Sequence, residues 1–342
     1  MSLTETPAAE TARAAALHRQ LMVIDASQSA PVTPEHLDRI RAGGIDTVST
    51  TIVHPEADFA ASVRAAGRAL ALVERHRAEV VHVRTAADVT RAKAEGRIGL
   101  ALAFQHAPVD QPGDLAVFHQ LGVRTIQLTY NTRNALGDGC VESPDGGLSR
   151  YGREVIRAMN RLGLLVDLSH CGDITTREAI LYSEVPVAVT HANARALCDS
   201  LRNKSDRTLE ALAQRRGVIG ANWWSPMNHN GLGRRPTVDE FFQHVDHLVR
   251  VCGIDHVGFG SDMGEGQDRA VWDAAFAQGG RFPEITGHLP WFNYESRMVD
   301  GLDSTTKFGR VTQELVRRGY GEEAIGKLLG GNFLRLFGQV WG

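Results

Sequence analysis

Two histidines at the ends of two short apolar runs give the first sign of chemistry in the chain. The run LLVDLSH (164–170) ends on His170, and VPVAVTH (185–191) ends on His191. Each run has the length and composition of a buried strand, and an apolar stripe between them predicts a helix. Strand, helix and strand over about thirty residues form a parallel crossover unit, which presents both imidazoles at one carboxyl edge. Neutral imidazole is a ligand for zinc and similar divalent ions.

Polar side chains also stand at the ends of other apolar runs. Because these runs alternate with helical passages, they predict one α/β domain, a single (β/α)8 TIM barrel, although a doubly wound sheet would satisfy the same count. In a barrel, the strand ends converge on one pocket mouth. The eight runs lie at 21–25, 45–53, 97–105, 123–131, 164–170, 185–191, 218–224 and 256–262, and their polar ends include Asp25, His54, Gln105, Tyr130, Asn131, Asn222 and Asp262.

The two histidines and the carboxylate of Asp262 suit a single divalent metal. Asp262 can bind the ion or accept a proton from its water, and Gln105 is a weaker, neutral third donor. The competing interpretation is that each polar residue only caps its strand. That interpretation explains one such residue more readily than three at equivalent strand ends.

Composition limits the classes of partner. The chain has 342 residues, of which 43% are hydrophobic and 23% charged, and its formal charge of −3 predicts neither a nucleic-acid nor a membrane partner. Four cysteines without CxxC spacing predict reduced thiols in a cytoplasmic protein. We expect no signal peptide and no membrane span, and a small molecule as the substrate.

The chain divides by pattern into two parts. Residues 1–19 predict a helical extension, and 20–342 the barrel domain, with a helical closure at the carboxyl end. Residues 263–305, here called the insertion, follow the last strand and are rich in aromatic residues. A loop of this length predicts a lid or a dimer contact.

Several motifs together resemble a known family. The segments QLTYNTRNALGDGC, DLSHCG, VTHANARAL with RNKSD, and HVGFGSD occur in order. They are similar to motifs of the membrane dipeptidase (renal dipeptidase-like) family of the amidohydrolase barrels, over residues 20–342. The resemblance implies a (β/α)8 barrel, a two-zinc site, hydrolysis of dipeptides (including those with a carboxyl-terminal D-residue) and a homodimer.

The resemblance also implies roles for individual residues. His170 and His191 match the histidines of the second zinc, and Asp262 matches the aspartate that takes the proton of the water. Arg202 matches the arginine that binds the substrate carboxylate. Tyr130 replaces a histidine near the scissile carbonyl, where its phenol can donate to an oxyanion. Asn131 and Asn222 are expected to contact substrate.

Three positions depart from the family pattern. The family's strand-1 His-x-Asp pair is replaced by Ser27 and Ser29, and its bridging glutamate by Gln105. These neutral side chains are poor zinc ligands, so we expect one divalent metal, zinc in the first place, and loss of the other site.

Three functions compete on these grounds. The first is a dipeptidase-like metallohydrolase that cleaves a dipeptide or an N-acyl amino acid with a free carboxylate. The second is a metal-depleted relative that binds or transforms a small amine or carboxylate metabolite by acid–base chemistry. The third is a binding protein that uses the insertion.

Overall fold

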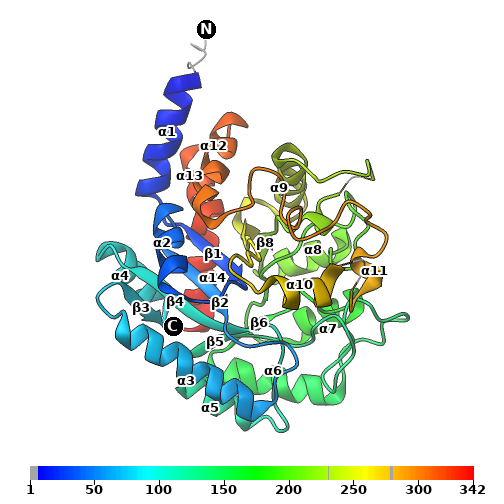
Figure 1. Cartoon of the computed structure of the whole chain (residues 1–342). Coiled ribbons are helices and arrows are strands. Elements are labelled where there is room, and N and C mark those ends of the chain that lie inside the picture. The colour runs from blue at the N-terminus through cyan, green and yellow to red at the C-terminus, as the bar shows by residue number, and fades with distance from the viewer. Residues whose placement is uncertain (1–6, 230, 278–279) are drawn as a thin grey trace.

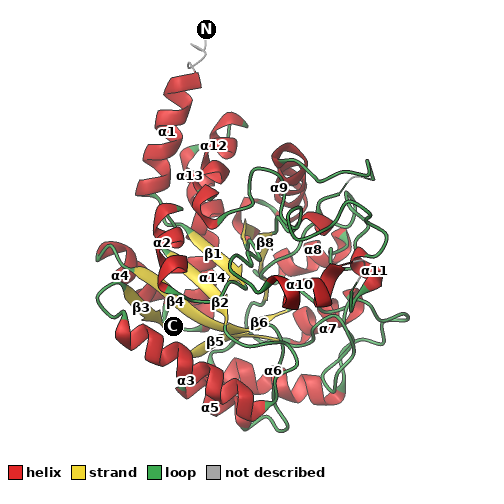
Figure 2. Ribbon diagram, viewed as in Figure 1, coloured by secondary structure: helices red, strands yellow, loops and turns green. Residues whose placement is uncertain are grey.

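A ring of parallel strands surrounded by helices forms the body of the computed structural model, which describes residues 7–229, 231–277 and 280–342 (Figures 1 and 2). Within these residues the strands pair in the order β1-β2-β4-β5-β6-β7-β8-β9, and β3 pairs with β4 outside this path. The bounds are β1 (Ile24–Gln28), β2 (Thr47–Thr51), β3 (Val80–Val83), β4 (Ile98–Phe104), β5 (Val123–Gln127), β6 (Leu165–Asp167), β7 (Ala188–Val189), β8 (Val218–Ala221) and β9 (Val257–Phe259).

The ring closes between its first and last strands. A parallel bridge joins Gln28 to Met263, and the backbone N–H of Asp262 donates to the Ser27 carbonyl at 2.8 Å. The fold is therefore the predicted α/β barrel. Closure also fixes Asp262 beside the end of β1.

The strands are buried on both faces, as parallel strands between helices and a barrel interior must be. All seven residues of β4 are buried. At the amino-terminal end of the strands, Phe333 and Phe337 of α14 pack with inward-facing residues such as Ile24 and Leu165. The carboxyl-terminal helix therefore closes the end of the barrel opposite the polar strand ends.

Helices cover the outside of the barrel, and many begin with a side chain that accepts a backbone N–H. Thr85 and Thr237 form capping boxes, and Ser149 and Ser205 cap two other helices. The bounds are α1 (Pro7–Gln20), α2 (Pro34–Ala42), α3 (Phe59–Arg75), α4 (Ala86–Ala94), α5 (Asp114–Gln120), α6 (Arg150–Leu162), α7 (Asp173–Tyr182), α8 (Asp206–Gln214), α9 (Val238–Cys252), α10 (Arg269–Phe276), α11 (Pro283–Thr286), α12 (Gly309–Arg317), α13 (Glu322–Gly326) and α14 (Asn332–Val340).

The predicted extension and insertion both have helical structure. Residues 7–19 lie in α1, which packs against α12, and the His18 Nδ1 bonds the Thr312 hydroxyl at 2.7 Å; residues 1–6 lie outside the described residues. The insertion contains α10 and α11. No helix in the described part of the chain is long and apolar enough to cross a membrane.

The regular strands are shorter than the apolar runs that predicted them. The run 123–131 contains β5 only as far as Gln127, and β7 has two residues. The polar ends lie just beyond the strands because the backbone turns there. Asn131 and Asp262 adopt left-handed φ angles of 60° and 56°, which short polar side chains tolerate better than others.

Candidate active site

A cavity of ≈ 470 Å³ opens at the carboxyl ends of the strands. Its walls come from strand-end residues on one side and from the insertion on the other. The strand ends contribute Ser29, Gln105, Tyr130, Asn131, His170, Arg202 and Asp262, and the insertion and its neighbours contribute Trp224, Trp272, Phe276, Phe282, Ile285 and Arg297.

The two predicted histidines meet beneath this cavity. Their Nε2 atoms lie 2.9 Å apart, and their rings are arranged edge to face with centroids 5.0 Å apart. Both residues are buried, and only His170 borders the cavity. Burial, with the nearby cations Arg202 and Lys204, lowers the pKa of each histidine well below its usual value, so both rings are neutral.

The outer nitrogen of each ring is held by a hydrogen-bond acceptor. The Nδ1 of His170 lies 2.7 Å from the Asn131 side-chain oxygen, which can only accept. The Nδ1 of His191 lies 2.8 Å from the Thr190 hydroxyl, which itself donates to Asp167 Oδ2 at 2.7 Å. Each Nδ1 therefore carries the hydrogen, and both Nε2 lone pairs point at one another.

Two converging lone pairs with fixed outer-nitrogen partners are the arrangement of histidine metal ligands. The pair therefore fits one ion. No carboxylate, thiolate or third imidazole joins the pair, because the described residues contain no group of three or more His, Cys, Asp or Glu that could hold a metal. The Gln105 amide donates to Asp262 at 3.5 Å, and the Ser29 hydroxyl accepts from Gln267 at 3.2 Å. This neutral side of the pocket does not fit a second ion.

Asp262 has a left-handed backbone conformation and a side-chain carboxyl group with a raised pKa. Burial raises the pKa of its carboxyl group to about 6, and the nearby Asp25 adds to this, while Arg202, Gln105 and Asn222 oppose it. A carboxylate that titrates near neutrality suits a general base. The left-handed φ of 56° marks local strain of the kind found at functional sites.

A buried carboxylate stands behind Asp262. Asp25 accepts from both the backbone N–H of Ser261 at 2.8 Å and its hydroxyl at 2.5 Å, and from the Gln28 amide at 2.7 Å. Burial raises the pKa of Asp25 to about 6. Because Ser261 precedes Asp262, these bonds fix the backbone from which Asp262 reaches the cavity.

Tyr130 and Asn222 flank the reacting centre in different ways. The Tyr130 ring stacks on His170 with centroids 4.2 Å apart, and burial raises the pKa of its phenol, so the hydroxyl keeps its proton. Asn222 is fully buried and does not border the cavity; its side-chain oxygen accepts from the Trp224 N–H at 2.5 Å. Substrate contact by Asn222 stays a prediction.

Arg202 brings a buried positive charge to the cavity without a carboxylate partner. One of its terminal nitrogens donates to the Ser169 carbonyl, and its Nη2 is buried with no hydrogen-bond partner. Among the described residues no acidic side chain forms an ion pair with it within 4.0 Å. Burying a cation without an anionic partner costs desolvation free energy, which an ion pair with a bound anion would offset.

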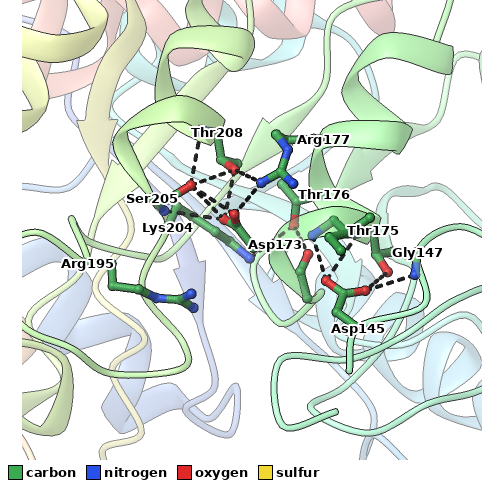
Figure 3. Close-up of polar contacts among 12 residues, drawn as sticks. Asp145, Gly147, Asp173, Thr175, Thr176, Arg177, Arg195, Lys204, Ser205 and Thr208 are labelled. Atoms are coloured by element: carbon green, nitrogen blue, oxygen red, sulfur yellow. Dashed lines mark hydrogen bonds and ion pairs between the residues drawn. The ribbon is translucent and has the colours of Figure 1, made fainter. Parts of the chain in front are cut away.

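The loop that carries Arg202 is fastened to α7 and α8 (Figure 3). Asp173 accepts from the Ser205 hydroxyl at 2.9 Å and the Thr208 hydroxyl at 2.8 Å. Lys204 points its ammonium at the Cys171 carbonyl, 2.7 Å away, and at the Thr176 hydroxyl, 3.2 Å away. Burial lowers the pKa of Lys204 to about 8. These bonds fasten the segment that directly follows Arg202.

The structure thus brings most of the nominated residues to one cavity, and Asn222 does not border it; the residues in or directly beneath the cavity are Gln105, Tyr130, Asn131, His170, His191, Arg202 and Asp262. Sequence reasoning missed Asp167 and Thr190, although each stands in one of the two histidine motifs, in DLSH and in VTH. It also missed Trp224 and the Asp25–Ser261 contact, which joins residues 236 positions apart.

Comparison with known proteins gives one consistent family. The family model described as membrane dipeptidase (peptidase family M19) matches residues 4–289 and 291–341. The dipeptidase verJ of Clonostachys rogersoniana is 28% identical over 79% of this chain and 62% of its own length. The dipeptidase tcpJ of Claviceps purpurea is 31% identical over 77% of this chain and 56% of its own length. The aligned region therefore spans less than two thirds of either relative.

Solved structures show the same architecture. An amidohydrolase from Pseudomonas aeruginosa superposes with a TM-score of 0.88 at 33% identity, covering 96% of this chain and 99% of the other. A metallopeptidase from Rhodobacter sphaeroides, solved with a phosphinate mimic of L-Ala-D-Ala, gives a TM-score of 0.76 at 21% identity, covering 94% and 99%. At that lower identity, the second likeness concerns the fold alone.

Proposed function

Because this chain belongs to the membrane dipeptidase family, peptidase family M19, we propose that it is a dipeptidase-like hydrolase. Its substrate is a dipeptide or an N-acyl amino acid with a free carboxylate. The observation that carries the proposal is that one cavity has two imidazole lone pairs at its floor, together with a carboxyl group that titrates near neutrality and a guanidinium without a carboxylate partner among the described residues.

A metal fits at the histidine pair. One divalent cation, zinc in the first place, would be held by the Nε2 atoms of His170 and His191 with Gln105 as a weak third donor, and it would polarise the scissile carbonyl and acidify water. Asn131, and Thr190 with Asp167, keep both rings in the tautomer that this requires. Loss of charge at Ser27, Ser29 and Gln105 restricts the site to one ion.

The remaining steps belong to three side chains. Arg202 binds the substrate carboxylate through its free Nη2, and this contact sets the position of the amide bond. Asp262 accepts the proton of the attacking water and returns it to the leaving nitrogen. Tyr130, which stays protonated, donates a hydrogen bond to the developing oxyanion.

One observation favours the metal-free alternative. Two nitrogens bound to one tetrahedral zinc at about 2.0–2.1 Å would lie about 3.3 Å apart. The observed separation of 2.9 Å is that of an N–H···N hydrogen bond, which two neutral rings form when one of them carries its hydrogen on Nε2 instead of Nδ1. In that form the cavity would bind a small carboxylate or amine metabolite, and acid–base chemistry would rest on the histidines and Asp262.

Metal content together with turnover tests the proposal. Protein purified without chelator should contain close to one equivalent of zinc and should cleave members of a library of dipeptides and N-acyl amino acids. His191→Ala should lose both metal and activity. Metal well below one equivalent, with no activity after addition of zinc or manganese, would refute the hydrolase and favour the metal-free form.

We also infer a reducing, cytoplasmic setting and a homodimer. All four cysteines are buried and unpaired, which supports the first inference. The dimer rests on the family resemblance, and light scattering of the purified protein tests it: a monomer mass would refute it.

A further inference from the structure

Part of the cavity wall is apolar and largely aromatic. Trp224 follows β8 and contacts both Phe276 and Phe292 edge to face, with ring centroids 5.9 and 5.5 Å apart. The apolar side chains that border the cavity are Trp224, Trp272, Phe276, Phe282 and Ile285, with Ile52 and Val53 from just beyond the end of β2.

This wall is built from two small apolar clusters. Trp272, Leu289 and Phe292 form one cluster within the insertion, whereas Phe282 and Ile285 form the other together with Cys140 and pack on Tyr130. Trp224 contacts both clusters. The apolar surface is therefore held in the cavity wall by packing within the insertion and against Trp224, Tyr130 and Cys140.

The cavity is bordered by two arginines without carboxylate partners among the described residues and by few carboxylates. Among the described residues that border it, only Asp262 and Asp268 carry carboxylates. Asp268 is engaged as the cap of α10, accepting from the Val271 N–H at 3.0 Å. Arg202 and Arg297 border the cavity and form no ion pair within 4.0 Å with any described acidic residue. A substrate ammonium thus has no carboxylate of its own here, apart from the proposed base.

We propose that the substrate is an N-acyl amino acid with a large apolar acyl group and no α-ammonium, a choice that rests on the proposed hydrolase function. Arg202 holds the carboxylate of the amino acid, and the acyl chain lies against the aromatic wall. The oxygen of water bonds to the acyl carbon and the C–N bond breaks. The proton goes to the leaving nitrogen, so that a carboxylic acid and a free amino acid are released.

Two physical effects favour an apolar N-acyl amino acid over a free dipeptide as the substrate. An apolar chain placed in an aromatic pocket gains from leaving water, and each added methylene contributes several-fold to discrimination. An ammonium buried without an anionic partner loses its hydration with nothing in return. Both effects disfavour small free dipeptides.

Three substrates separate these effects in the purified holoenzyme. 3-Phenylpropanoyl-alanine and phenylalanyl-alanine differ only in the α-ammonium, whereas acetyl-alanine lacks the apolar group. With L- and D-alanine in parallel, we expect kcat/KM for 3-phenylpropanoyl-alanine to exceed both others by at least about 10-fold. Equal or faster cleavage of phenylalanyl-alanine would overturn the inference and leave the hydrolase standing.

Binding provides a readout that does not depend on turnover. Calorimetry with uncleavable ketomethylene analogues of the first two substrates should show tighter binding without the ammonium, again by at least about 10-fold. If no substrate is cleaved and this difference persists, the hydrolase fails and the recognition stands. Equal affinities would overturn the recognition.

A pair of variants tests the wall. Phe276→Ala should reduce the ratio of kcat/KM for 3-phenylpropanoyl-alanine over acetyl-alanine by about 5- to 10-fold. The control is Leu181→Ala, which removes an exposed apolar side chain on α7 that does not border the cavity. It should leave that ratio unchanged. An unchanged ratio in Phe276→Ala would overturn the proposed acyl site.

Discussion

The hydroxyl of Thr190 links the metal-facing histidine to a buried carboxylate, and its removal offers a sharp test of the site. It accepts from His191 Nδ1 at 2.8 Å and donates to Asp167 Oδ2 at 2.7 Å. Thr190→Val keeps the shape of the side chain and deletes both bonds. His191 can then adopt the other tautomer, with the hydrogen on Nε2, where it opposes metal binding.

The magnitude follows from the groups left unpaired. The Nδ1–H and Oδ2 are both buried, and a buried polar group that loses its partner costs about 1–3 kcal/mol. The free energy of unfolding should therefore fall by about 2–6 kcal/mol in the metal-free protein. Loss of such an outer partner lowers metal affinity about 10–100-fold.

Thr312→Val provides the matched control. Its hydroxyl is equally buried and bonds His18 Nδ1 at 2.7 Å, where α1 meets α12, remote from the cavity. Both variants should lose stability in urea unfolding with chelator present, but only Thr190→Val should lose zinc affinity in a chelator-competition titration. The reasoning is refuted if the two variants bind zinc equally well, or if Thr190→Val matches the unmodified protein within about twofold.

Four further outcomes follow from the same geometry. On the acid side, kcat/KM should fall with an apparent pKa of about 6, since Asp262 must be deprotonated to accept a proton and burial raises its pKa to about 6; a flat profile from pH 5 to 7 would contradict this. Arg202→Met should lower kcat/KM by at least about 30-fold for substrates with a free carboxylate and leave the amidated forms of those substrates little changed. In chelated protein, Gln105→Glu should raise the pKa of Asp262 further, because its side chain lies 3.5 Å from that carboxylate and like charges repel; carbon NMR titration measures it, and a downward shift would exclude it. Ser27→His combined with Ser29→Asp and Gln105→Glu should bind a second equivalent of zinc, which metal analysis detects; retention of one equivalent would argue against the assignment of the lost ligands.

The barrel could be predicted from sequence because its signals are local. Continuous apolar runs such as 97–105 predict strands that are buried on both faces, and β4 is such a strand. The histidine pair followed from the same logic, since strands that neighbour each other in sequence also neighbour each other in the barrel. The meeting of His170 and His191 needed no information beyond strand order.

Contacts made through loops and across the closure of the barrel could not be predicted in this way. Asp25 and Ser261 are bonded although they are 236 positions apart, because β1 and β9 close the ring. The hydrogen bond from Thr190 to Asp167 depends on where strand β6 ends relative to β7, which apolar periodicity does not specify. The aromatic insertion was recognised by composition, but nothing in the sequence showed that Trp224 would join its two clusters.

The balance of buried charge decides what the cavity must bind, with or without a metal. Arg202 Nη2 is buried without a partner, and a charge of this kind lowers the stability of the ligand-free protein. An incoming carboxylate supplies the missing hydrogen-bond partner of Arg202 and forms an ion pair with its buried charge. Recognition of an anion therefore does not depend on hydrolysis. The one-metal and metal-free forms therefore share the same ligand class and differ at His170 and His191. Carboxylate binding measured in chelated protein should persist in His191→Ala and be lost in Arg202→Met; loss in both variants would show that recognition and the histidine pair are not separable.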